Sequence, residues 1–190
     1  MRRSARVLAL AACAATISLG SPATAWGQDV LDVKSATEVR NRYLADLDTV
    51  HAKVMALANA IPEEKYSWRP GTGVRSISEA LMHIATEWYI YTPMSVAMKA
   101  PDGFGTPGEM GTKLEKVTKK SEVINELNKS WTHCRAQLTA TDASKLTGKY
   151  KPWDATLPEA AFGMGGDLHE HLGQMIAYAR SVGVKPPWTK

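Results

Sequence analysis

Hydrophobic residues recur every three or four positions in four segments of the chain, which predicts four amphipathic helices. The expected helices cover residues 36–61, 77–99, 119–139 and 166–182. We find no segment with the convincing alternation of apolar and polar residues that marks a half-buried strand. Four such helices bury their apolar faces most simply against one another. We therefore expect an all-α fold, an antiparallel four-helix bundle.

Polar residues mark the expected starts of the first two helices. Residues 35–38 and 76–79 have the S-x-x-E form of a capping box, in which two side chains satisfy free backbone N–H groups. The connections between helices are long and contain Pro and Gly, at residues 62–75, 100–111 and 147–165. Loops of a dozen residues or more are unusual in a plain bundle and are often functional.

The start of the chain has the layout of a secretory signal peptide. Arginines near the N-terminus precede an apolar run, residues 7–19, that is too short to span a bilayer. Ala23 and Ala25 then supply an A-x-A pattern for cleavage after Ala25. We expect residues 1–25 to be a signal peptide and residues 26–190 to form one mature domain, periplasmic or secreted.

The two cysteines add one alternative and one expectation. Cys13 ends an L-A-A-C sequence that suits a lipoprotein signal. This reading is less favoured because only residues 7–12 would form its apolar core. Cys134 would be the one thiol left after cleavage, so the mature chain has no intramolecular disulfide. It falls on the apolar face of the third expected helix, which predicts a buried, unreactive thiol.

Removal of the signal peptide changes the charge of the chain. The whole sequence has 23 Lys and Arg against 19 Asp and Glu. Arg2, Arg3 and Arg6 leave with the signal, so the mature chain has 20 against 19, a net charge of +1. This balance gives no reason to expect a nucleic-acid partner or an anionic membrane surface. No later segment is long and apolar enough to be a membrane span.

Three polar residues lie near the apolar faces of the second and fourth helices. Each residue of a helix turns by about 100°, so Asp167 and His171 share a face while His169 points away from it. His83 flanks the apolar face of the second helix. Two imidazoles and a carboxylate that face inward from two helices are typical of metal sites in bundles. The alternative is that each is a hydrogen-bonded residue at the edge of the core.

Two stretches of the chain resemble the signature regions of the DinB-like superfamily of metal-binding four-helix bundles. Residues 61–89 contain a W-R-P-G turn and a helix with a histidine, and residues 165–188 contain H-x-G-Q, Y-x-R and G-V-x-P-P. The resemblance implies a divalent metal held by one side chain of the second helix and two of the fourth, spaced by four. His83 and His171 match the first and last positions of this set.

Asp167 stands at the middle position, where the family usually has a histidine. A carboxylate can bind zinc, nickel, iron or manganese, so the identity of the metal stays open. An assignment with His169 in place of Asp167 would need a change of helix register. We therefore expect His83, Asp167 and His171 to be the metal ligands.

The resemblance implies chemistry with a metal but leaves the reaction open. Characterised relatives are similar to thiol-dependent transferases and isomerases, yet an exported protein meets few reduced thiols. Hydrolysis would need no such cofactor. Glu87, one turn after His83, is the candidate base or supporting carboxylate. We expect a metal-dependent transferase or hydrolase that acts on a small-molecule substrate, or a metal- or ligand-binding module without catalysis; a homodimer is one option for its assembly.

Overall fold

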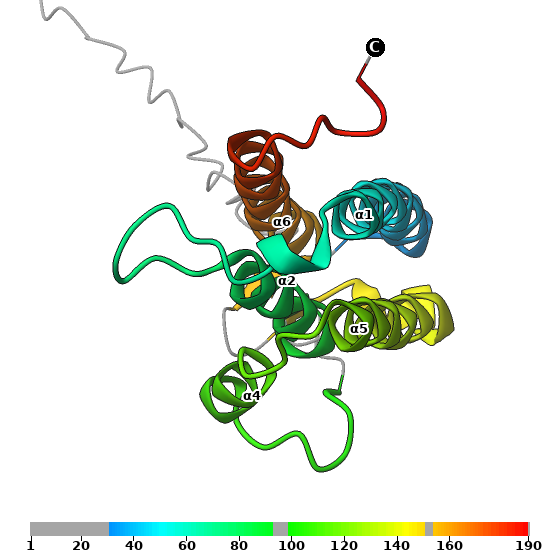
Figure 1. Cartoon of the computed structure of the whole chain (residues 1–190). Coiled ribbons are helices and arrows are strands. Elements are labelled where there is room, and N and C mark those ends of the chain that lie inside the picture. The colour runs from blue at the N-terminus through cyan, green and yellow to red at the C-terminus, as the bar shows by residue number, and fades with distance from the viewer. Residues whose placement is uncertain (1–30, 93–98, 151–153, 190) are drawn as a thin grey trace, which may run out of the picture.

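The computed structural model describes residues 31–92, 99–150 and 154–189, and over these the protein is a bundle of helices (Figure 1). The all-α fold expected from the sequence is confirmed. The expected signal peptide and its cleavage site lie outside the described residues. The long helices are α1 (Val33–Ala60), α2 (Ile77–Thr86), which continues into η2 (Glu87–Tyr91), α5 (Lys120–Ala140) and α6 (Leu157–Ser181).

Smaller elements fill the connections between the long helices. A short helix, α4, packs on the outer side of α2. A two-stranded antiparallel hairpin, with Lys149 opposite Thr156, precedes α6. The smaller elements are η1 (Glu63–Lys65), α4 (Pro107–Leu114), η3 (Ala143–Leu146), β1 (Lys149–Tyr150) and β2 (Ala155–Thr156).

Contacts at the helix ends give the directions of α1 and α5. The side chain of Arg40, near the start of α1, donates to the carbonyl of Thr141 at the end of α5, at 2.9 Å. At the other end, Lys120 donates to the carbonyl of Ile61, at 2.7 Å. These two helices are therefore antiparallel.

The helices α2 and α5 are packed neighbours that run in the same direction, so the antiparallel arrangement expected from the sequence does not hold for this pair. Both begin near the end of α1, because Tyr66, which precedes α2, donates to the carbonyl of Ala58 at 2.7 Å and Lys120 bonds beside it. A chain that joins two parallel neighbours must return along the length of the bundle. This requirement explains the long connection that contains α4.

Two of the expected loops contain α-helical residues, so the predicted extents of those loops were wrong. The connection at 100–111 contains the start of α4, and α6 begins at Leu157 rather than at residue 166. Both helices start with a threonine cap followed by proline and a capping glutamate: Thr106 with Glu109, and Thr156 with Glu159. The capping-box pattern was therefore present in the sequence at both positions.

Glycines inside α6 had suggested a loop. Gly165 is buried, and a Cβ at this position would lie 3.5 Å from the ring of Tyr43 on α1. A glycine in a helix costs about 0.5–1 kcal/mol relative to alanine. The packing of α6 against α1 stabilises the helix in spite of this cost, and the local sequence does not reveal that packing.

Of the two capping boxes expected from the sequence, one is confirmed and one needs a correction. The capping box of Ser76 and Glu79 is formed, with the backbone N–H of Ser76 donating to Glu79 at 2.7 Å. Helix α1 begins earlier than expected, because Asp32 rather than Ser35 is its cap. The carboxylate of Asp32 accepts from the backbone N–H of Ser35 at 2.8 Å.

The core is formed by the apolar faces of the long helices. Cys134 is buried within it, as predicted, and burial raises the pKa of its thiol well above the ordinary value. Among the described residues, no helix has both the length and the apolar character needed to cross a bilayer.

Candidate metal centre

Polar side chains of α2 and α6 meet in the middle of their shared interface. His83 and Glu87 are four residues apart and therefore lie on one face of the second helical segment. His171 faces them from α6, with Asp167 one turn before it. These four residues come from segments that are about 80 positions apart in the sequence, so only the packing of α2 on α6 brings them together.

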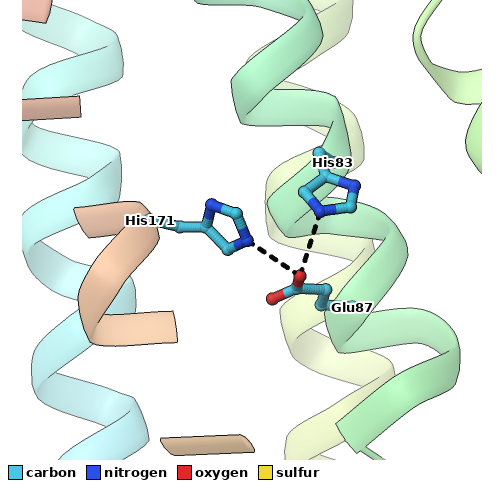
Figure 2. A group of neighbouring side chains, drawn as sticks. All are labelled: His83, Glu87 and His171. Carbon is cyan, nitrogen blue, oxygen red and sulfur yellow. Dashed lines mark ion pairs between the residues drawn. The ribbon is translucent and has the colours of Figure 1, made fainter. Parts of the chain in front are cut away.

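The two imidazoles converge on one oxygen of Glu87 (Figure 2). Nε2 of His83 lies 3.2 Å from Oε1 of Glu87, and Nε2 of His171 lies 3.0 Å from the same oxygen. The two rings meet edge to face, with centroids 4.8 Å apart. One donor atom from each of the three side chains lies within 4.8 Å of the others. The cluster is thus compact enough to surround a single ion.

Glu87 stands where the helix changes its winding. Helix α2 ends at Thr86, and the segment η2, Glu87–Tyr91, is a π-helical turn. The backbone N–H of Glu87 still bonds to the carbonyls of His83 and Ile84. Single π turns within helices are rare and occur frequently at functional sites.

Burial and hydrogen bonding together set the charges of the cluster. The side chain of Glu87 is 3% exposed, while those of His83 and His171 are 21% and 18% exposed. Burial by itself raises the pKa of Glu87, but hydrogen bonds from His171 and His83 outweigh it and lower that pKa to about 2. The hydrogen bond to Glu87 raises the pKa of His171. In the metal-free protein, Glu87 is therefore a carboxylate, and His171 keeps its proton to a higher pH than an ordinary histidine does.

The second oxygen of Glu87 gives a test of whether a metal fits. This atom, Oε2, is buried and has no hydrogen-bond partner among the described residues. A buried polar atom without a partner is costly, and a nearby cation would remove that cost. Two imidazole nitrogens and a carboxylate also form a donor set that suits zinc, nickel, iron or manganese. The residues present thus fit the divalent metal that the sequence predicted.

Comparison with known families gives an independent result. A family model for the DinB superfamily matches residues 46–175, more than half of the chain. The chain belongs to the DinB superfamily. The match includes His83, Glu87 and His171, and it confirms the resemblance found in the sequence. No curated protein and no solved structure matches the chain.

In this DinB superfamily member, Asp167 lies at the edge of the cluster. Its Oδ1 atom is 3.9 Å from Nε2 of His171, and its side chain is partly exposed. Burial raises the pKa of Asp167, and the negative charge of Glu87 together with a side-chain interaction between the two carboxyl groups raises it further. His169 points to the other side of α6, where its Nε2 contacts both carboxylate oxygens of Asp46 on α1 at 3.0 Å. The structure thus brings His83 and His171 together and separates His169 from them.

The sequence named Glu87 only as a base or supporting residue. In the structure this DinB superfamily chain places Glu87 between the imidazoles, closer to both than Asp167 is to His171. The four-residue spacing of His83 and Glu87 was the available signal, the same spacing that pairs Asp167 with His171. The predicted ligand role of Asp167 stays a prediction.

Proposed function

We propose that this DinB superfamily member binds one divalent metal ion between α2 and α6, with His83, Glu87 and His171 as its protein ligands. The observation that carries the proposal is the convergence of two imidazoles from different helices on one buried carboxylate. The second oxygen of this carboxylate has no hydrogen-bond partner within the part of the chain that the structure describes. The proposal exchanges two roles given by the sequence. Glu87 becomes a ligand, and Asp167 becomes the carboxylate at the open edge.

Three protein ligands are the number typical of catalytic rather than structural metal sites, because they leave coordination positions open. A divalent ion held there would act as a Lewis acid toward a small-molecule substrate. Asp167 is partly exposed beside His171, and its raised pKa suits a group that accepts a proton. We therefore propose a metal-dependent transferase or hydrolase. A binding module without catalysis is the alternative, in which Asp167 would have no chemical role.

We further propose that the protein works outside the cytoplasm. The support is the layout of residues 1–25, with arginines, a short apolar run and the A-x-A pattern at Ala23 and Ala25. Mass spectrometry of the protein from its native host should find a mature chain that begins at Trp26. A diacylglyceryl group on Cys13 would instead identify a lipoprotein, and an intact N-terminus would contradict export.

Metal affinity measured in competition with a chelator tests the proposed centre. Outer-shell partners of a metal site are worth roughly 10–100-fold in affinity, so loss of a direct ligand should cost more. We expect His83→Ala, Glu87→Gln and His171→Ala each to exceed that loss. His169→Ala is the matched control on the opposite side of α6 and should bind like the parent. Equal binding by all five proteins would show that the cluster is only a hydrogen-bonded part of the core.

A further inference from the structure

The ring nitrogen of His171 that faces away from Glu87 also has a partner. Nδ1 of His171 lies 3.3 Å from Oε1 of Gln174, one turn further along α6. The amide nitrogen of Gln174 donates to the hydroxyl of Tyr178 at 3.0 Å. Both nitrogens of this imidazole are thus engaged. One faces the proposed metal centre, and the other begins a series of side-chain hydrogen bonds along α6, from His171 through Gln174 to Tyr178.

Tyr178, the last residue of this series, contacts the segment that precedes α2. The buried ring of Tyr178 packs edge-on against Trp68, with ring centroids 5.4 Å apart at 79°. The carbonyl of Trp68 accepts from the backbone N–H of Ile77, the first residue of α2, at 3.0 Å. The contacts from His171 to Trp68 therefore connect the two helices that carry the proposed ligands.

The chemistry of imidazole determines which group donates and which accepts in these hydrogen bonds. When Nε2 binds a metal, the proton of a neutral histidine must reside on Nδ1, and that N–H needs an acceptor. The carbonyl oxygen of Gln174 is such an acceptor. With that oxygen facing His171, the amide N–H of Gln174 faces the hydroxyl of Tyr178, which accepts it.

We infer that Gln174 is a positioning residue for the metal centre: it holds the His171 ring with Nδ1 protonated and Nε2 turned toward the ion. The inference rests on the proposed metal site and adds a residue to it. Tyr178 contributes by holding the amide of Gln174 in the required orientation. Gln174 itself does not touch the ion.

Zinc affinity of the purified protein and two variants tests this role. Gln174→Met keeps the length of the side chain but removes the acceptor, and we expect zinc to bind about 10–100-fold more weakly, the usual effect of losing an outer-shell partner. Gln174→Glu keeps an acceptor and should restore most of the affinity. Gln137→Met, on α5, is the matched control and should bind like the parent.

The imidazole proton gives a readout that a merely structural role would not change. In the zinc-loaded parent, the Nδ1–H signal of His171 should be protected from exchange with water in ¹⁵N NMR spectra, and in Gln174→Met it should exchange rapidly. Tyr178→Phe, which keeps the buried ring, should weaken zinc binding and hasten this exchange in the same direction. It provides the test if Gln174→Met does not fold.

The outcomes separate the inference from the proposal beneath it. A parent that binds no zinc contradicts the metal centre itself. A parent that binds zinc, together with Gln174→Met and Tyr178→Phe proteins of equal affinity and equally protected Nδ1–H, overturns the role of Gln174 alone.

Discussion

Two histidines of α6, only two residues apart, contact carboxylates of other helices at the same distance. His171 lies 3.0 Å from Glu87, and His169 lies 3.0 Å from Asp46. Their surroundings differ. The side chains of His169 and Asp46 are 47% and 44% exposed, whereas that of Glu87 is 3% exposed. The Glu87 carboxylate also contacts a second imidazole, that of His83.

The comparison teaches that contact distance alone does not identify a functional pair. When an exposed ion pair forms, contacts between the two charges replace contacts with water, so the pair contributes only about 0–1 kcal/mol to stability. A buried carboxylate that has lost its water depends on its partners for all its stabilisation. Loss of one partner is thus more costly for the pair at His171 than for the pair at His169, and the buried carboxylate is the better cation site.

The largest expected difference is in the stability of the metal-free protein. The double variant His83→Ala, His171→Ala leaves Glu87 buried without a partner, which should lower the free energy of unfolding by about 3–5 kcal/mol. His169→Ala leaves Asp46 in water and should lower it by less than ~1 kcal/mol. Urea unfolding followed by circular dichroism measures both values.

Adding Glu87→Gln to that double variant checks the cause. Removal of the buried charge should recover most of the lost stability. If the triple variant is as unstable as the double variant, the loss comes from cavities left by the imidazoles and not from an unpaired carboxylate.

The pH dependence of stability should also distinguish the two pairs. The folded protein raises the pKa of His171 above its ordinary value of 6.5, so this residue stabilises the fold fully below pH 6.5, and the contribution is lost as the pH rises through the raised pKa. In metal-free protein, the free energy lost in His171→Ala should be larger at ~pH 5.5 than at ~pH 9. An equal loss at both pH values would show that charge on His171 adds nothing to the fold.

A smaller effect is expected at the edge of the centre. Asp167→Asn removes a charge near His171 but no proposed ligand, so zinc affinity should fall by about 10-fold, at the lower end of the range for outer-shell partners. Chelator competition alongside Glu87→Gln gives the ranking. If Asp167→Asn is the more damaging change, the original assignment of Asp167 as a ligand is right and the exchange of roles is wrong.

No effect is expected at the buried thiol of the core. Cys134 is buried, and its raised pKa disfavours the reactive thiolate. Labelling of this thiol should be slow in the native parent and equally slow in His169→Ala and Asp167→Asn. Rapid labelling in either variant would mean that the change disturbs the bundle and not only the site.

The sequence predicted the fold well where periodicity decides it. Helices occur in all four expected segments, and the capping box at Ser76 and the buried position of Cys134 agree with the structure. The second expected helix, residues 77–99, is helical through Thr92, and its residues 93–98 lie outside the described part of the chain. The start of α6 was missed because its glycines suggested a loop, while the packing of Gly165 on Tyr43 depends on a residue far away in the sequence. Local patterns contain no information about such contacts.

For the site, helix geometry was sufficient to separate the directions of His169 and His171. It was not sufficient to decide which of two carboxylates, Glu87 or Asp167, is the better candidate metal ligand. Glu87 and Asp167 each lie four residues from a histidine, and they differ in burial, because the Glu87 side chain is 3% exposed and that of Asp167 is 45% exposed. This burial comes from tertiary packing.

Titration of metal-free protein with zinc, followed by the ¹⁵N signals of its imidazoles, tests the central claim most directly. One equivalent should shift the Nε2 signals of His83 and His171 to values typical of metal-bound nitrogen and leave those of His169 unchanged. Saturation beyond one equivalent, a metal-bound signal from His169, or unchanged signals from His83 and His171 would contradict a single ion held by His83, Glu87 and His171.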